Sequence, residues 1–525
     1  MHAIEPVPQA KEPAGDRLAG LRVLFLPKNS RTGFFQSFLR TARETCGWRI
    51  QVLCPAGSER VWREAIGGEG GCIGLPDFDA AADWERDAAK TSEIEAFVAA
   101  CERTSGVSAG RIILAGEREL GRGFSVPIFY WFHDRTARRV LADNTEPNRI
   151  VRRMFAFARE TLAAAKPDLV MAGEWADSIC FVFYLAARQM GIPAIVNRRS
   201  KLWSGRSYWT SDLGMYNDAA RVKAVEKTKT GGSVSARAAE RLASFRAGPQ
   251  TLGYVKDNWN MLDRRGWLGS HVEVARLLAV DLRHRLDKTG TPPAKPALRL
   301  LWDIYRRGWL KFRQSGFFRR FGENELRDMR YILIALHKDP EQALNHQAFI
   351  WSNQFNTVSL LSSSLPGGFR LLVREHRSNA GRRPTQFYTD MRRLPGVVLV
   401  DGFDDQFKYI RNADLIVTDN GTTGWEGLVM GRPIITLADT YYDAAGLARR
   451  VNDHDALGSA VLEMLEHADA QDSALHDAAM GRLLDAEWDT SAPLDEESHA
   501  RALALLNELY APASRASASA TPLFA

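Results

Sequence analysis

The sequence predicts an α/β protein that contains two doubly wound parallel sheets. Three observations support this prediction. Short apolar strands alternate with helical segments between residues 331 and 437, and a similar alternation occurs between residues 21 and 196. The strands of the second half also end in clusters of polar residues. Because ligands of such sheets bind outside the carboxyl ends of the strands, these clusters mark the expected site.

Residues 413–437 give the clearest pattern, which is a strand, a glycine-rich turn, a helix and a second strand. The strand covers residues 414–418, a short apolar and β-branched run. Gly421 and Gly424 allow the backbone to turn sharply and to come close to a ligand. A helix is expected over residues 425–430, and the Gly-Arg-Pro sequence that follows ends it.

Thr422 and Thr423 therefore lie at the N-terminus of a helix. Backbone N–H groups and the positive end of the helix dipole favour an anion there, and two hydroxyls add donors, so we expect a phosphate or diphosphate. Glu426 lies one turn further along, where its carboxylate can accept hydrogen bonds from ribose hydroxyls. The alternative is an ordinary capped helix that packs on the sheet.

Three further strands precede this turn, at residues 331–337, 369–374 and 397–400, with helices expected to start near Ser352, Arg383 and Asp404. Polar clusters follow the strands at residues 337–341, 375–377 and 401–404. Since the carboxyl ends of parallel strands meet at one edge of a sheet, a single site would collect six side chains. These are His337, Glu341, His376, Thr422, Thr423 and Glu426.

The segments ALHKDPE, LLVREHRS and ADLIVTDNGTTGWEGLVMGRPII, all within residues 331–451, resemble those of capsular-polysaccharide and surface-carbohydrate biosynthesis proteins. That family consists of GT-B glycosyltransferases related to the bacterial Kdo transferases of capsule assembly. The resemblance covers about a quarter of the chain. It implies two Rossmann-like domains facing a cleft, with His376 facing the donor phosphate, the two threonines gripping it and Glu426 holding the ribose.

The resemblance favours a CMP-linked acidic sugar such as Kdo as the donor. The family's usual Lys-Glu-His-Pro segment is replaced here by residues 374–377, Arg-Glu-His-Arg, which lacks the proline. This departure leaves UDP-linked and other sugars open.

The first half is interpreted as the second sheet domain. Its strands are expected at residues 21–26, 50–53, 111–114, 168–171 and 194–196, with a helix from about Phe34. The loop with Asn29, Ser30 and Gly33 follows the first strand, where it would suit acceptor contacts, although it would equally serve as a simple connector.

Glu174 follows the fourth expected strand, at a place suited to a general base or nucleophile, and its alternative is a surface position. Arg198, together with Arg199 and Lys201, follows the fifth expected strand. These cations would hold an acidic sugar or an acceptor phosphate, or else belong to a solvated basic loop.

Residues 215–328 read as a helical connector. Within it, Leu298, Trp302, Tyr305, Trp309 and Phe312 recur at helical spacing. Seven cations surround them, namely Arg299, Arg306, Arg307, Lys311, Arg313, Arg319 and Arg320. Residues 298–320 therefore form either a helix that lies on an anionic membrane surface or a connector whose aromatic stripe packs on a domain.

Composition excludes several other classes. A net charge of +6 over 525 residues, without a nucleic-acid motif, argues against a nucleic-acid partner. Five cysteines without a CxxC pair indicate reduced thiols rather than disulfides or zinc. The Asp77-Phe78-Asp79 triplet imitates a metal-binding DxD but follows no clear strand, so we expect no metal and no cofactor.

The first residues lack the apolar core of a signal peptide, and the apolar run at residues 179–187 is too short to span a bilayer. We therefore expect a cytoplasmic protein, either soluble or peripheral at the inner face of the membrane.

The combined prediction is a metal-independent GT-B glycosyltransferase. It would move a sugar from a nucleotide-sugar donor to a surface polysaccharide or its lipid-linked primer. The alternatives are a polyol-phosphate transferase of the teichoic-acid type and a catalytically silent GT-B scaffold of a capsule assembly complex. Residues 21–214 would form the acceptor domain and residues 329–510 the nucleotide-sugar domain with terminal helices. Residues 1–20 and 511–525 would be disordered tails.

Overall fold

The protein is described here from a computed structural model. Apart from four isolated positions between 272 and 279, the residues that it describes are 17–27, 32–54, 59–67, 71–76, 91–115, 145–173, 175, 178–212, 214, 216–229, 231–249, 297–338, 343–443, 446–467 and 473–510.

The first sheet has seven strands in the order β13-β6-β5-β4-β1-β2-β3. Five of them pair in parallel, namely β1 (Arg22–Leu26), β2 (Arg49–Cys54), β3 (Gly71–Gly74), β4 (Leu169–Ala172) and β5 (Ala194–Arg199). Two antiparallel strands, β6 (Arg206–Thr210) and β13 (Ala492–Pro493), extend the β5 edge. The chain order of the parallel strands is therefore 3-2-1-4-5, that of a doubly wound nucleotide-binding sheet.

Helices cover both faces of this sheet. One core contains residues of α4 (Thr91–Ser105), α5 (Ala109–Ala115), α7 (Thr145–Ala165) and α8 (Ser178–Gln189). The opposite core contains residues of α1 (Thr32–Cys46), α2 (Glu59–Ile66) and α21 (His499–Leu509). Inward-facing residues alternate along β1, since Leu24 belongs to the first core and Phe25 to the second.

The second sheet has six strands, all parallel, in the order β12-β11-β10-β7-β8-β9. They are β7 (Tyr331–Ala335), β8 (Arg370–Arg374), β9 (Val397–Val400), β10 (Leu415–Thr418), β11 (Ile434–Thr436) and β12 (Arg449–Arg450). The connecting helices are α15 (Gln354–Ser363), α16 (Thr385–Met391), α17 (Gln406–Asn412), α18 (Thr422–Val429) and α19 (Ala456–Glu466). Counted within the domain, the order is 3-2-1-4-5-6, which reverses between β7 and β10.

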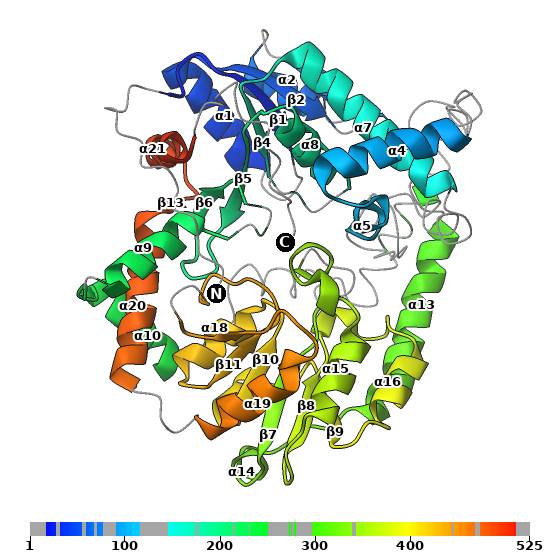
Figure 1. Cartoon of the computed structure of the whole chain (residues 1–525), viewed down its shortest axis with the longest axis vertical. Coiled ribbons are helices and arrows are strands. Elements are labelled where there is room, and N and C mark those ends of the chain that lie inside the picture. Colours follow the sequence, from blue (N-terminus) through cyan, green and yellow to red (C-terminus); the bar gives the residue numbers. More distant parts are fainter. Residues whose placement is uncertain are drawn as a thin grey trace.

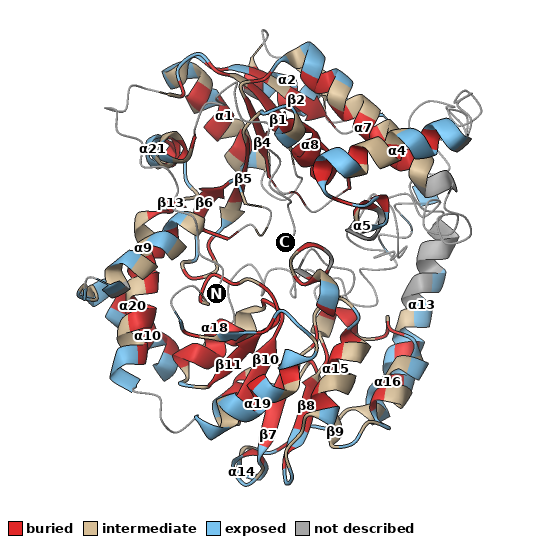
Figure 2. Ribbon diagram, in the orientation of Figure 1, coloured by how far each residue is buried: buried red, intermediate tan, exposed pale blue. Residues whose placement is uncertain are grey.

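Both sheets confirm the predicted fold class of two Rossmann-like doubly wound domains. Figure 1 shows the two sheets in separate lobes. In the predicted connector, the described helices are α9 (Asp218–Lys229), α10 (Ala236–Ala247), α13 (Ala297–Gln314) and α14 (Glu323–Arg327). Buried residues are concentrated on the strands and on the sheet-facing sides of the helices (Figure 2).

The end of the chain returns to the first lobe. Helix α20 (Ser473–Asp489) packs on α9 and α10, then β13 joins the first sheet and α21 packs on α1. The indole Nε1 of Trp209, on β6, donates to the backbone oxygen of Ala502 at 2.9 Å. Helix α20 shares a buried core with the second sheet, whereas α21 belongs to a core of the first sheet. The terminal helices that were predicted in the domain at residues 329–510 therefore divide between the two lobes.

The strand predicted at residues 111–114 is wrong, because these residues lie in α5. Its run of three apolar residues fits a buried helix as well as a strand. Here the hydroxyl of Ser108 accepts a hydrogen bond from the backbone N–H of Arg111 at 3.1 Å, as an N-cap does. Ile112 then packs in the core beside α7 and α8.

The carboxyl ends of the two sheets face one another. The guanidinium of Arg111 lies 3.8 Å from the ring centroid of Phe349 and donates to the backbone oxygen of His346 at 3.2 Å. The ring of Phe181, in α8, lies 4.8 Å from that of His346. Lys201, after β5, lies 5.8 Å from the ring of Tyr441, after β11. Residues of α5 and α8 and the segment after β5, in the first lobe, therefore contact the segments that follow β7 and β11 in the second lobe.

Candidate functional site

The glycine-rich turn lies where the strand order of the second sheet reverses. Strand β10 ends at Thr418, and α18 begins at Thr422 after its N-cap, Gly421. The backbone N–H of Gly421 donates to Thr418 Oγ1 at 3.1 Å, which holds the turn. The first N–H groups of a helix have no partner within that helix, so those of Thr422 and Thr423 suit an anion.

Two glycines at this corner have different roles. A Cβ on Gly421 would lie 3.1 Å from Thr418 Oγ1 and 3.4 Å from the ring of His337, so the turn packs closely on both residues. A Cβ on Gly424 would lie only 2.0 Å from the hydroxyl of Tyr442 and 2.9 Å from Thr418 Cγ2. Gly424 therefore allows α18 to pack against its own domain, and its close approach to a ligand stays a prediction.

His337 follows β7 directly opposite this turn, and its backbone is fixed by three hydrogen bonds. Its N–H donates to Gln354 Oε1 at 2.7 Å, and its carbonyl accepts from Asn379 at 3.1 Å and from Arg383 at 2.9 Å. Its Nε2 lies 3.6 Å from Asp419 Oδ2.

Asp419 was absent from the sequence-based site. Burial raises the pKa of this carboxyl to about 6, and the neighbouring His337 opposes the shift. A buried carboxyl paired with a histidine at the switch point is a combination that occurs at functional sites. In the sequence, Asp419 could have been identified as a candidate by its position as the first polar residue after β10.

His376 follows β8, the neighbour of β7 on the side away from β10. Its Nδ1 accepts a hydrogen bond from the backbone N–H of Ser378 at 3.2 Å. The preceding Glu375 is buried and accepts from Arg383 at 3.1 Å and from Tyr388 at 2.7 Å. Strands are spaced about 4.8 Å apart, so His376 and α18 flank a span of roughly 10 Å across β7.

Glu426 is buried in α18, where Gln406 Nε2 donates to both carboxylate oxygens at 3.2 Å. Burial raises the pKa of this carboxyl to about 7, against smaller lowering effects of Arg374, Thr422 and Gln406. The side chain thus faces the interior next to the N-terminus of α18. Its contact with a ribose stays a prediction.

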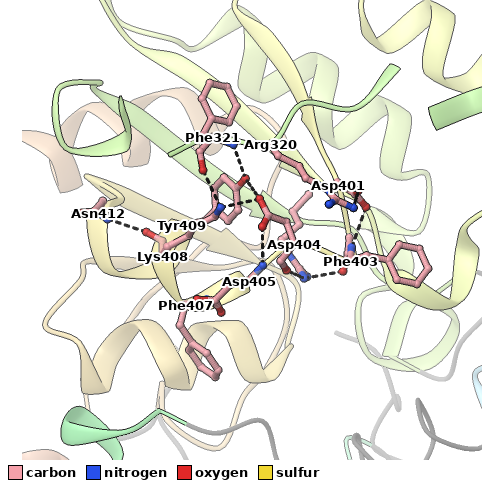
Figure 3. Close-up of polar contacts among 12 residues, drawn as sticks. Arg320, Phe321, Asp401, Phe403, Asp404, Asp405, Phe407, Lys408, Tyr409 and Asn412 are labelled. Atoms are coloured by element: carbon pink, nitrogen blue, oxygen red, sulfur yellow. Dashed lines mark hydrogen bonds and ion pairs between the residues drawn. The ribbon is translucent and has the colours of Figure 1, made fainter. Parts of the chain in front are cut away.

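The polar cluster after β9 has a structural role instead. Asp404 accepts from Lys408 at 2.8 Å and from the hydroxyl of Tyr409 at 2.6 Å, and Asp401 pairs with Arg320 at 2.7 Å (Figure 3). These contacts tie the loop to α17 and to the segment before α14.

Several predicted residues lie outside the described part of the chain, so the structure does not place them. These are Asn29, Ser30, Asp77, Asp79, Glu174 and Glu341. Gly33 is exposed in α1, and Arg198 is half-buried on β5 opposite Tyr208. The acceptor-binding assignments therefore stay predictions.

A second contact missed by sequence reasoning joins this corner to the other lobe. Asn420 Nδ2 donates to the side-chain oxygen of Gln347, and Gln347 Nε2 donates to the backbone oxygen of Gly214. Asn420 is buried and directly precedes the N-cap of α18. The turn that precedes α18 is thus linked through one side chain to the loop after β6.

Within the described part of the chain, no group of three or more His, Cys, Asp or Glu side chains is arranged to hold a metal ion. None of the helices in that part of the chain combines the length and the apolarity needed to cross a membrane.

No protein-family model and no curated protein matches this chain. Among solved structures, the glycotransferase of kitacinnamycin is 14% identical, with 94% of this chain and 100% of that chain covered and a TM-score of 0.26. The calicheamicin glycosyltransferase CalG4 is 12% identical, with 93% and 98% covered and a TM-score of 0.26. UDP-GlcNAc 2-epimerase from Neisseria meningitidis is 13% identical, with 89% and 98% covered and a TM-score of 0.27. Scores this low carry no argument, so the fold assignment rests on the strand order.

Proposed function

We propose that this protein is a glycosyltransferase that moves a sugar from a nucleotide-activated donor to a hydroxyl of a surface polysaccharide or its lipid-linked primer. The observation that supports it best is the anion-suited N-terminus of α18 at the switch point of one Rossmann-like sheet, opposite a second such sheet. The sequence resemblance of residues 331–451 to capsule glycosyltransferases supports the same activity.

In the proposed reaction, the bond between the anomeric carbon and the donor phosphate breaks, and the acceptor hydroxyl oxygen bonds to that carbon. The phosphate leaves with the electron pair, so its negative charge grows. The N–H groups of Thr422 and Thr423, the dipole of α18 and His376 would stabilise this charge. Glu174 is the proposed base that receives the acceptor proton, or a nucleophile in a two-step route.

On the basis of the family resemblance, the proposed donor is a CMP-linked acidic sugar such as Kdo. Arg198 is a cation suited to the carboxylate of such a sugar. Fixed positive groups would make a metal unnecessary, so we propose that transfer continues in EDTA. Loss of transfer in EDTA, with recovery in Mg²⁺ or Mn²⁺, would contradict this and would point to Asp77 and Asp79 as ligands.

Nucleotide binding tests the site. A ligand that binds only the native state raises the unfolding temperature, so a screen of CMP, CDP, UDP and GDP identifies the nucleotide. With that nucleotide, His376→Ala and Thr422→Ala should each weaken binding about ten- to a hundredfold, through loss of one charge-assisted hydrogen bond. The matched controls are His467→Ala, at the C-cap of α19, and Thr389→Ala, in α16. Both should bind the nucleotide as tightly as the parent.

If both site variants fold and bind the nucleotide as tightly as the parent, the site assignment is wrong. Transfer assays with labelled donor then separate the remaining alternatives. Transfer of a polyol phosphate would indicate the teichoic-acid type of enzyme. Binding without any turnover would indicate a catalytically silent scaffold.

A further inference from the structure

Helix α13 is fixed to the second lobe by one of its faces. Leu310 and Gln314 on this face are buried, with exposed fractions of 7% and 1%. Gln314 Nε2 donates to the backbone oxygen of Arg383 at 3.0 Å, and Arg307 Nε donates to that of Ala380 at 3.1 Å. A Cβ on Gly381 would lie 2.3 Å from the Arg307 carbonyl, so the loop lies directly against the helix backbone.

The opposite face carries the aromatic stripe, and it is open to solvent. The exposed fractions are 67% for Trp302, 51% for Tyr305, 55% for Trp309 and 81% for Phe312. At 100° per residue, these four side chains lie within a sector of about 80°, whose centre is about 140° around the helix from that of Leu310 and Gln314. The packed-connector interpretation is therefore wrong for these four residues, since other side chains hold α13 to the domain.

Most of the cations predicted to surround the stripe contact the protein itself. Arg319 pairs with Glu325 at 2.9 Å, and Arg320 pairs with Asp401 at 2.7 Å (Figure 3). Arg307 contacts the Ala380 loop, and Lys311 lies 4.1 Å from the ring of Phe403.

Two exposed cations, Arg306 and Arg313, lie beside the aromatic stripe. The guanidinium of Arg313 is 5.1 Å from the ring of Trp309. The side chain of Arg299 lies outside the described part of the chain. Only these two described cations are thus placed to meet a surface that the rings contact.

We propose that this face of α13, formed by Trp302, Tyr305, Arg306, Trp309, Phe312 and Arg313, binds the surface of an anionic lipid bilayer. Aromatic rings partition into the headgroup layer, and flanking cations meet anionic lipids there. The stripe is about 15 Å long on a helix already held to the domain, so binding requires no refolding. The helix runs along the outer edge of the molecule (Figure 1), where a flat surface can reach it.

The proposal does not depend on the sugar-transfer activity. Nucleotide binds at α18 in the proposed function, whereas lipid would bind at α13. Failure of one therefore leaves the other standing, and the two can be measured on the same protein.

Co-sedimentation with vesicles tests the proposal. We expect the full chain to bind vesicles of phosphatidylglycerol and phosphatidylcholine at low salt. Binding should weaken about twenty-five-fold in pure phosphatidylcholine, because two cations each contribute about fivefold. Trp302→Ser/Trp309→Ser should reduce binding to anionic vesicles at least tenfold.

The matched control is Leu462→Ser/Leu475→Ser, which removes two other exposed apolar side chains, from α19 and α20. This control should bind vesicles like the parent, and all three proteins should have similar unfolding temperatures and nucleotide affinities. A parent that ignores anionic vesicles at low salt would overturn the proposal, as would equal binding by the tryptophan variant.

Size-exclusion chromatography distinguishes a second copy of the chain from a bilayer as the occupant of this face. If the parent is a dimer that the tryptophan change converts to a monomer, and it binds no vesicles, the face is a protein interface and the proposal fails. If the tryptophan variant unfolds, the single changes Phe312→Ser and Trp309→Ser are measured instead. Unaltered vesicle binding by both would equally refute the proposal.

Discussion

Replacing Glu426 with Gln should change how the stability of the protein depends on pH. Burial raises the pKa of this carboxyl from 4.5 to about 7 in the folded state. Below pH 4.5 the group is protonated in both states and has no effect on their balance. Between these values the unfolded chain releases the proton while the folded chain keeps it, so rising pH lowers the free energy of unfolding.

Each unit of pKa difference corresponds to 1.36 kcal/mol. The shift at Glu426 therefore amounts to about 3 kcal/mol, which is lost progressively between about pH 4.5 and pH 7. Glutamine has nearly the same shape and cannot ionise. The Glu426→Gln variant should thus gain about 3 kcal/mol relative to the parent as the pH rises from 4.5 to 8.

Urea unfolding of both proteins at several pH values measures this difference. Subtraction removes the contributions of other titrating groups that the two proteins share. A difference that stays constant from pH 4.5 to 8 would show that Glu426 titrates at an ordinary pKa. A difference of the opposite sign would mean that Arg374 and Gln406 stabilise the charged form more strongly than burial opposes it.

Two further predictions concern the corner at α18, and Gly308 in α13 serves as the comparison for the first of them. Gly424→Ala should lower the free energy of unfolding by about 1–3 kcal/mol through its clash with Tyr442, and less in a Tyr442→Phe background. Gly308→Ala, with open space around its Cβ, should raise it by up to about 1 kcal/mol, and thermal unfolding with equal losses for both would contradict this account. If ribose hydroxyls donate to Glu426, they favour its charged form, so nucleotide binding at pH 7 should release a proton. Calorimetry in phosphate and Tris buffers measures this release, and its persistence in Glu426→Gln would exclude Glu426 as the source.

Local patterns predicted the second sheet well. The runs at residues 331–336, 371–373 and 415–417 are apolar and bounded by polar residues, which is the pattern of fully buried parallel strands. The helix starts near residues 352, 383 and 404 were also predicted to within two residues. These features depend on interactions between residues close in the chain.

Long-range contacts explain what the sequence did not predict. β13 has only two residues and becomes a strand because it pairs with β6, almost three hundred positions earlier. Strand β6, with the sequence RSYWT, was not predicted either. It becomes a strand through its antiparallel pairing with β5. Strand β3, with two glycines in four residues, has little β-propensity of its own.

The same difference between local patterns and long-range contacts applies to the candidate site. Thr422 and Thr423 were expected at a helix N-terminus because glycines and an apolar strand define that corner locally. The importance of Asp419 depends on His337, which follows a different strand and approaches only because β7 and β10 are neighbours. Parallel strands become neighbours through crossovers, and strand order is a property of the whole fold. The sequence can therefore show that each of two residues follows a strand. Only the strand order of the folded sheet shows that the two side chains meet at the switch point.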